Sequence, residues 1–227
     1  MKFYIYISDS KIDMLLAQIP REQKRKIATE FKFDLKVLSA SRKSEVESED
    51  NRFVRLETVI AFIREYGNVG SVDDPNEYVQ DELSMRWGPY DAIDSPLVYF
   101  AGETEKTVVG LAGSKKHLIG NSMGESFICS YSYAPNILYY LRKELGLSLK
   151  WREKRVAKQL ERFGEYQNKS DAYLSTIYSA SRGASGPEQN LEFVAKRLLY
   201  GNSSRAWGED SNRTVLLATP LYVAMVD

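Results

Sequence analysis

The order in which strand-like and helix-like patterns follow one another limits the fold of this chain more than any single motif does. Alternating apolar residues rich in β-formers indicate strands at 2–7, in a central meander at about 68–130, and at 214–226. Apolar residues spaced by three and four indicate helices elsewhere, above all across about 134–200. Strands and helices are therefore grouped rather than alternating one by one. We expect an α+β fold with a mixed, largely antiparallel sheet flanked by helices.

The same patterns predict individual elements. Before residue 130 they indicate helices at 10–18, 20–29 and 51–66, and strands at 2–7, 31–39, 83–87, 97–100, 107–111 and 126–130. Residues 102–105 should form the turn of a hairpin. Later they indicate helices at 137–145, 151–163, 174–178 and 191–199, then strands at 214–219 and 221–226. Pro220 should mark a bend or an edge, and the last strands should return to the sheet that 2–7 begins.

The composition excludes several kinds of site. The 227 residues, at 43% apolar and 27% charged, fit one globular domain over 1–227. A single Cys and a single His exclude disulfide frameworks, Cys-rich clusters and two-His metal centres, so we expect no metal site and can assign no cofactor. Equal numbers of basic and acidic residues, 31 each, do not favour nucleic acid as a partner.

No segment resembles a signal peptide or a membrane span. The apolar stretch at the N-terminus ends at Ser8 and Asp9, which is too short for a signal-peptide core. The longest apolar run, 215–226, is interrupted by Thr219 and Pro220 and is too short to cross a bilayer. We therefore expect a cytoplasmic protein without a membrane partner.

Charge is concentrated locally. Residues 65–105 contain ten acids and one base, Arg86, whereas residues 141–162 contain eight bases and three acids. Such runs are most often solvated faces that neutralise one another. A basic helix at 150–162 would alternatively offer a surface for a protein partner, for self-association or for a phosphate-bearing molecule.

A glycine-rich segment is the first candidate binding site. Gly110, Gly113, Ser114, Lys115, Lys116 and His117 follow the strand expected at 107–111. Glycines let backbone N–H groups point at an anion, while Ser and Lys add a hydroxyl and positive charge. The segment lacks the Walker A pattern, and an ordinary turn with exposed lysines is the alternative.

Two further segments join it as candidates. Ser8, Asp9, Lys11 and Asp13 follow the first strand, where a sheet often places a ligand site, although a helix cap with a local salt bridge is the alternative. Arg86 and Trp87 would offer a fork-shaped cation and a stacking face, or else an internal counter-ion beside a core aromatic.

The segment 120–124 matches G-x-S-x-G, the nucleophile elbow of hydrolases. In that fold the catalytic His follows the Ser, whereas the single His of this chain, His117, precedes Ser122. Activation of a serine needs a positioned base. We do not expect Ser122 to be a nucleophile.

Several of these segments, taken together, resemble a known family. KFYIYISDSKIDML at 2–15, SMRWG at 84–88, GLAGSKKHLIG at 110–120 and VLLATPLYVA at 215–224 are similar to an uncharacterised bacterial family of unknown function. The resemblance covers nearly the whole chain and carries no activity. It supports the choice of the three candidate segments without implying a reaction.

The leading functional expectation is a module that binds a small phosphate-bearing ligand, plausibly a nucleotide, as a sensor or regulatory domain. It requires the three candidate segments to converge on one anion site. The first alternative is an enzyme acting on a nucleotide or nucleic acid through Asp9, Asp13 or Asp81 as base or Mg²⁺ ligand. The second is a protein–protein interaction module, and the sequence does not decide whether the chain is an enzyme.

Overall fold

Five strands close into a barrel in the structure, a computed structural model that describes residues 2–30, 49–89, 97–120, 134–145, 167–202 and 213–226. Around the ring, each strand pairs with the next in the order β3 (Tyr78–Pro89), β4 (Leu97–Glu103), β5 (Thr107–Ser114), β7 (Thr214–Met225) and β6 (Gln189–Asn202), and β6 pairs again with β3. Within the ring, β5 and β7 form the parallel pair and the other pairs are antiparallel. The fold is therefore α+β with a mixed, largely antiparallel sheet, as expected.

The connectivity of the ring is that of a five-stranded Greek-key barrel of the OB type. Three consecutive strands, β3 to β5, form a meander, and the last two strands enter in reversed order. β3 is long enough to pair with β6 through Tyr78–Met85 and with β4 through Met85–Pro89. β1 (Phe3–Ile7) extends the sheet beside β7, and β2 (Val69–Gly70) lies parallel to β3.

Large apolar side chains fill the inside of the barrel. They alternate along the strands with side chains that point outward, because successive residues of a strand face opposite sides. Phe100, Val109, Leu111, Phe193 and Leu216 belong to this interior cluster and are completely buried. Tyr6 of β1 reaches into the same cluster, so the N-terminal strand contributes to the barrel core.

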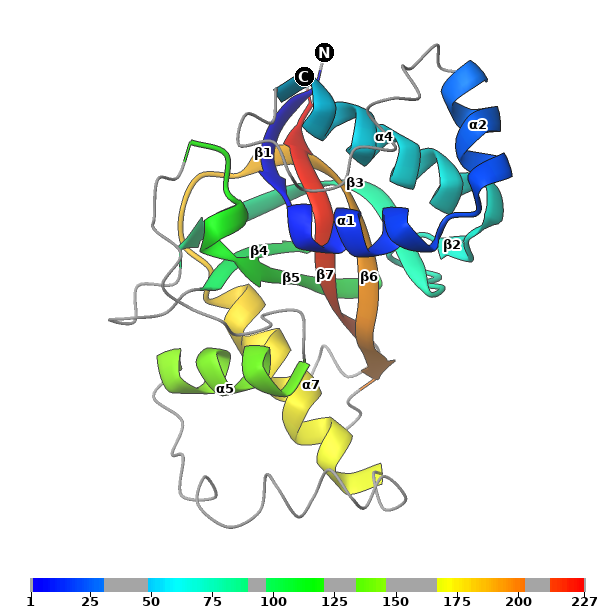
Figure 1. The fold of residues 1–227 in the computed structure, drawn as a ribbon. Coiled ribbons are helices and arrows are strands. Elements are labelled where there is room, and N and C mark those ends of the chain that lie inside the picture. Colours follow the sequence, from blue (N-terminus) through cyan, green and yellow to red (C-terminus); the bar gives the residue numbers. More distant parts are fainter. Residues whose placement is uncertain are drawn as a thin grey trace.

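Helices cover two sides of the barrel (Figure 1). α1 (Asp9–Gln18) and α4 (Glu49–Tyr66) share a core with the outer faces of β1, β6 and β7, and α2 (Arg21–Glu30) packs on α4. α5 (Ala134–Glu144) and α7 (Gln167–Arg182) share another with β4, β5 and β7. None of the helices within the described ranges is long and apolar enough to cross a membrane.

Most of the expected elements are confirmed. The structure contains the strands expected at 2–7, 83–87, 97–100 and 107–111, the hairpin turn between β4 and β5, and the helices expected near 10–18, 20–29, 51–66, 137–145 and 174–178. Pairing of β1 with β7 confirms that the end of the chain returns to the first strand. α4 ends where the N–H of Gly67 bonds to the carbonyl of Ile63, as a C-terminal glycine predicts.

The helix expected at 191–199 is wrong, because these residues belong to β6. Leu191, Val194, Ala195, Leu198 and Leu199 have helical spacing in the sequence. In the structure Leu191, Phe193 and Ala195 face the barrel interior, whereas Val194 faces the α1 and α4 side. Register shifts at Val194/Ala195 and Arg197/Leu199 break the simple alternation of a strand. The apolar residues of β6 consequently have a spacing in the sequence that resembles that of a helix.

The two strands expected on either side of Pro220 form one continuous strand, β7. Proline has no N–H to donate, so within a sheet it is tolerated at edges and bulges. Pro220 pairs with Ala195 at the register shift between β6 and β7. The sequence therefore identifies an irregular position correctly but not the continuity of the strand.

Several expectations lie outside the described residues. They are the strand at 31–39, the strand at 126–130, the helix at 151–163 with its basic stretch 150–162, and Ser122 in the G-x-S-x-G segment.

Candidate functional site

Two of the three candidate segments meet at the middle of β7. β5 runs parallel to β7 as far as the Leu111–Ala218 pair, and β1 runs antiparallel to it from the Ile7–Tyr222 pair. The carboxyl ends of β5 and β1 consequently point toward each other across residues 219–221 of β7. The N–H of Ile119 also bonds to the carbonyl of Ile5, at 3.0 Å. Ser8–Asp13 and Ser114–His117 therefore form one strand-end cluster.

Lys11 is the most unusual member of the strand-end cluster. It lies on the first turn of α1, is 9% exposed, and its Nζ donates a hydrogen bond of 2.9 Å to the carbonyl of Pro220. Burial lowers the pKa of this amine to about 7. No carboxylate within the described ranges pairs with it. Lys11 is therefore an amine that changes charge near neutral pH.

Asp9 links the strand-end cluster to α4. Its two carboxylate oxygens accept hydrogen bonds from Nε and Nη2 of Arg52, at 2.8 and 2.9 Å. Nδ1 of His117 lies 3.8 Å from the same carboxylate. Burial acts to raise the pKa of Asp9, but His117 and Arg52 outweigh it and hold the pKa below its ordinary value. Asp9 is therefore an ionised carboxylate held between the guanidinium of Arg52 and the imidazole of His117.

His117 is buried beside Tyr6. The two rings meet edge to face with centroids 5.9 Å apart. Burial lowers the pKa of His117, Asp9 opposes this, and the charges of Lys116 and Lys11 lower the pKa further. At neutral pH the imidazole is consequently uncharged. Asp13 pairs with Arg55 at 3.3 Å, one turn further along α1.

The glycine-rich segment 110–117 does not form the loop that we expected. Gly110, Gly113 and Ser114 belong to β5, whose residues are buried on both faces, and a short 3₁₀ turn, η1 (Lys115–His117), follows directly. A Cβ on Gly110 or Gly113 would overlap the side chain of Tyr99 or Tyr6, respectively. The two glycines therefore make room for tyrosine rings. The backbone of Gly110–Ser114 pairs with β4 or β7 and is not available to cradle a phosphate.

The two residues of the third segment diverge, and Trp87 lines a pocket with Ile5, Leu118 and Gly120 beside the strand-end cluster. Arg86 and Trp87 are neighbours on β3, so their side chains point to opposite faces of the sheet. Trp87 stacks on Phe100 of the interior cluster, at 5.6 Å between centroids, and its Nε1 donates to Gln189. Arg86 points outward. The expected convergence of Arg86 and Trp87 on one ligand does not occur.

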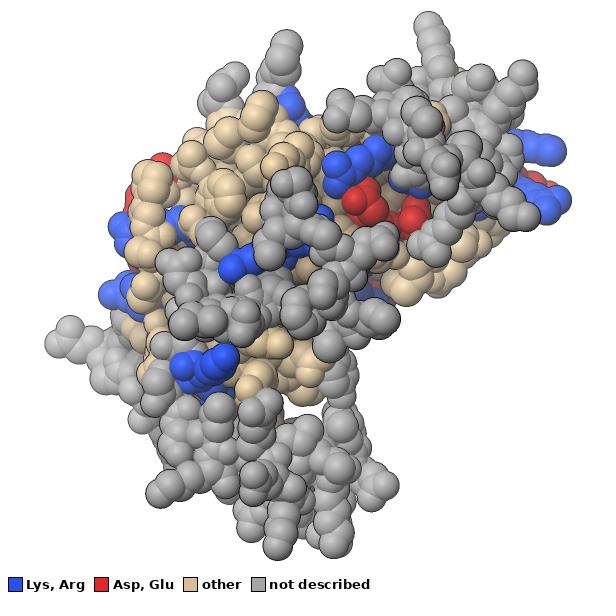
Figure 2. Space-filling view, turned by 60° about the vertical axis from the view of Figure 1, so that its left-hand side comes forward, with Lys and Arg blue, Asp and Glu red and all other residues tan. Residues whose placement is uncertain are grey.

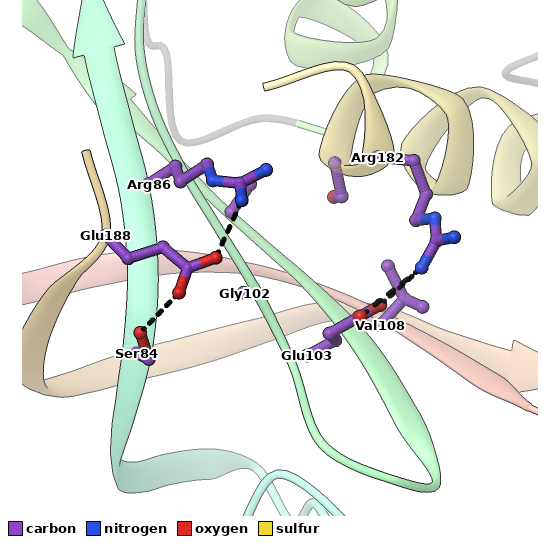
Figure 3. Close-up of a pocket in the computed structure, with 9 residues that line it drawn as sticks. Ser84, Arg86, Gly102, Glu103, Val108, Arg182 and Glu188 are labelled. Carbon is purple, nitrogen blue, oxygen red and sulfur yellow. Dashed lines mark hydrogen bonds and ion pairs between the residues drawn. The ribbon is translucent and has the colours of Figure 1, made fainter. Parts of the chain in front are cut away.

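Arg86 instead lines a polar pocket of about 350 Å³ (Figure 3). Its Nη2 pairs with Glu188 at 2.7 Å, and Glu188 also accepts a hydrogen bond from Ser84. On the other side of the pocket, Arg182 at the end of α7 pairs with Glu103 at 3.1 Å. The remaining lining residues are Ala101, Gly102, Val108 and Ser181. We call this the arginine pocket.

The charged side chains that line the arginine pocket balance one another, two arginines against two glutamates. Glu103 is shared, since Arg213, which does not line the pocket, also pairs with it at 3.1 Å. All four pocket-lining charged side chains are roughly half exposed, so solvent and ligands reach them. An anion could therefore take the place of either carboxylate beside its arginine.

Sequence analysis missed Arg182, Glu103 and Glu188 as members of this pocket. Arg182 and Glu188 border a Gly- and Pro-containing segment, 182–187, between the patterns at 174–178 and 191–199. An isolated Arg at the last turn of a helix, followed by a short loop into a strand, is the signal that could have drawn attention to it. Without the strand register, nothing in the sequence places it opposite Arg86.

A family model described as a family of unknown function (DUF7019) matches residues 2–227. The chain belongs to this family. The resemblance inferred from the sequence motifs is thereby confirmed. No curated protein and no solved structure matches the chain. The DUF7019 match assigns no chemistry, so the sites must be judged on their geometry.

The carboxylates considered for catalysis in this DUF7019 chain are already engaged. Arg52 holds Asp9 and Arg55 holds Asp13, while Asp81 accepts the N–H of Val72 at 2.9 Å. No group of three or more potential ligands that could hold a metal ion is present within the described part of the chain. A divalent ion at any of these carboxylates would have to displace an existing partner.

Proposed function

We propose that the chain is a binding module for a small anionic, phosphate-bearing ligand, and that the arginine pocket holds this ligand. The observation that carries the proposal is the placement of Arg86 and Arg182 on facing walls of one polar pocket (Figure 3). Guanidinium groups present several N–H donors in a plane and match phosphate oxygens in pairs. A phosphate between them would replace the exposed carboxylates of Glu188 and Glu103.

The position of the two arginines suggests how binding would be sensed. Arg86 belongs to the barrel, whereas Arg182 is the last residue of α7. A ligand held by both would tie the end of this helix to the sheet. Binding to the folded state alone stabilises a protein by about 3 kcal/mol when the ligand is at a hundred times its Kd. Such a tie is what a regulatory module requires.

The pocket supports a phosphate more strongly than a nucleotide. No aromatic ring is among its lining residues, and Trp87, which we expected to stack on a base, faces the barrel interior instead. The proposal therefore concerns the phosphate group, and binding measurements with different phosphate compounds would identify the rest of the ligand.

The covering of the barrel does not support a role in binding oligonucleotides. OB-type barrels bind them on the face formed by the second and third strands, which here are β4 and β5. Outward residues of these strands, such as Leu97, Tyr99 and Val108, are buried under α5 and α7. On the face shown in Figure 2, the described Lys and Arg side chains stand in separate groups rather than in one band.

The acidic segment 65–105 gives little support to a charged docking surface. Glu65 pairs with Lys26, Glu77 with Lys196, and Glu103 with Arg182 and Arg213. These partners come from other parts of the chain, so much of the acidic charge is neutralised within the fold. Exposed pairs of this kind contribute little to stability.

We expect Arg86→Gln and Arg182→Gln each to weaken anion binding by roughly ten- to a hundred-fold, since a hydrogen bond to a charged group contributes about 1.5–3 kcal/mol. Binding is measured by calorimetry and thermal shift with inorganic phosphate, pyrophosphate, sugar phosphates and nucleotides. Arg64→Gln is the matched control, because Arg64 is a similarly exposed arginine on α4 that pairs with Glu192. Absence of binding to every phosphate compound at millimolar concentration would contradict the proposal.

Removal of a competing carboxylate should have the opposite effect. Glu188→Gln leaves Arg86 without its 2.7 Å ion pair and should tighten phosphate binding several-fold. An unfolded or damaged variant could only bind more weakly, so a gain identifies the pocket directly. Binding that is no tighter in a Glu188→Gln variant shown to be folded would contradict contact between Arg86 and the ligand.

A further inference from the structure

The two carboxylates of the arginine pocket differ in the cations available to them. Glu103 pairs with Arg182 and also with Arg213, each at 3.1 Å. If a phosphate took Arg182, Glu103 would keep the guanidinium of Arg213 as its partner. The charge of Glu103 is therefore compensated whether or not the pocket holds a ligand.

Glu188 has no such second cation. One of its carboxylate oxygens pairs with Nη2 of Arg86 at 2.7 Å, and the other accepts a hydrogen bond of 3.4 Å from the hydroxyl of Ser84 (Figure 3). Within the described ranges, Arg86 is the only cationic group that pairs with Glu188. A phosphate that took Arg86 would consequently leave this carboxylate without a counter-charge.

The released carboxylate would lie close to the bound phosphate, because both groups would be beside the same guanidinium. Two negative groups at such a distance repel each other, and water and salt screen this repulsion only in part. A positive group on the ligand would replace the repulsion by an attraction to Glu188. The arrangement of charges therefore favours a ligand that carries a cation as well as a phosphate.

The size and lining of the pocket restrict this ligand further. A volume of about 350 Å³ is near the lower end for small-molecule sites, and the direct contact between Arg86 and Glu188 requires only a short spacer between phosphate and cation. Quaternary ammonium groups are recognised by aromatic faces, and no aromatic side chain is among the described residues that line the pocket. A primary ammonium group instead donates its N–H groups to acceptors such as Glu188 and the Ser84 hydroxyl. The pocket therefore matches a primary amine.

We propose that the ligand of the arginine pocket is a short aminoalkyl phosphate. Its phosphate binds between Arg86 and Arg182, and its ammonium group binds the carboxylate of Glu188. This inference rests on the phosphate site proposed above and names the class of molecule that occupies it. The same chemistry occurs in free aminoalkyl phosphates and in the headgroup of an aminophospholipid.

The test measures binding to the full chain by calorimetry and compares phosphoethanolamine with ethyl phosphate, which lacks only the amine. A chelator is present so that no divalent ion supplies the positive charge. Phosphoethanolamine should bind about three- to five-fold more tightly, the range expected for an exposed ion pair. Phosphocholine should lose this advantage, because its quaternary ammonium has no N–H group to donate.

Glu188→Gln separates the contribution of the amine from that of the phosphate. Ethyl phosphate should bind this variant more tightly than the wild type, whereas the advantage of phosphoethanolamine over ethyl phosphate should disappear. Unfolding would weaken the binding of both compounds together and cannot produce this pattern. Glu105→Gln is the matched control and should keep the wild-type preference, because Glu105 is an exposed glutamate between β4 and β5 that does not line the pocket.

The possible failures are distinguishable. Equal binding of phosphoethanolamine and ethyl phosphate to the wild type, or a preference that persists in Glu188→Gln, would overturn the amine contact and leave the phosphate site in place. Absence of binding by either compound would overturn both proposals. Vesicles that contain phosphatidylethanolamine distinguish the two sources of the ligand. Co-sedimentation that Arg86→Gln abolishes assigns a lipid headgroup, and binding of the free compound alone assigns a small molecule.

Discussion

Lys11→Met is expected to make the chain more stable than wild type near pH 6, by a margin that becomes clearly smaller near pH 9. The buried amine has a pKa of about 7 in the folded chain, against 10.5 for an ordinary lysine. Between these values the unfolded chain binds more protons than the folded one, so the wild-type free energy of unfolding rises with pH. The full rise is at most about 5 kcal/mol, of which about 3 kcal/mol falls between pH 6 and pH 9.

Methionine removes both parts of this balance. Below pH 7 it abolishes the cost of burying a charged amine, and between pH 7 and the ordinary lysine pKa it abolishes the smaller cost of releasing that proton on folding, while at every pH it removes the bond to the Pro220 carbonyl. The difference in unfolding free energy between variant and wild type, from urea titrations, should therefore shrink as the pH rises. The pH range stays below that in which the tyrosines ionise.

The matched control is Lys116→Met, which removes an exposed lysine from the same cluster. Its stability should follow the pH dependence of the wild type. If the curves of Lys11→Met and wild type ran parallel from pH 6 to pH 9, Lys11 would not be a buried titrating amine.

Gly113→Ala is expected to destabilise the chain by about 3 kcal/mol, the upper end of what added volume costs in a packed core. An alanine Cβ at this position would lie 2.7 Å from Cζ of Tyr6 and even closer to its hydroxyl, in the barrel interior. Tyr6 is completely buried between β1 and β5 and has no room to move away. Urea unfolding measures the loss.

A change at Tyr6, the residue that the new Cβ would overlap, tests this explanation. In a Tyr6→Phe background, Gly113→Ala should cost clearly less, because the group nearest the new Cβ is gone. Tyr6→Phe alone should cost little, since the buried hydroxyl that it removes has no hydrogen-bond partner of ordinary geometry within the described part of the chain. Gly88→Ala on β3 is the control, as nothing lies within 4 Å of its Cβ position. Equal losses at Gly88 and Gly113 would contradict the account.

The meeting of Ser8–Asp13 with Ser114–His117 could be anticipated from sequence, and the role of the glycines could not. Both segments follow apolar strands, and polar residues at strand ends collect at the edges of a sheet. A glycine before Ser and Lys reads as a loop when neighbouring strands are unknown. Only the structure reveals that Tyr6 and Tyr99 occupy the space that side chains at 113 and 110 would need.

The arginine pocket was predicted only in part. Arg86 was recognisable as the lone base in an acidic stretch, and it does line a pocket. The expectation that Trp87 shares a ligand with Arg86 was wrong, because adjacent residues on a strand point to opposite faces. Arg182 and Glu188 could not be found, since their position depends on how α7 packs on the barrel. Such packing depends on contacts between distant segments.

The ring of strands cannot close until the last strand exists. β7 alone joins β5 to β6, and it also supplies the only neighbour with which β1 pairs as a ladder among the described strands. While the protein is being synthesised, β1, β5 and β6 would therefore each have an unpaired edge until β7 is made. Contacts between the first and last residues make such folding slow and expose edges that can pair with other chains. Loss of even the final dozen residues should leave a nascent chain dependent on chaperones and prone to aggregate.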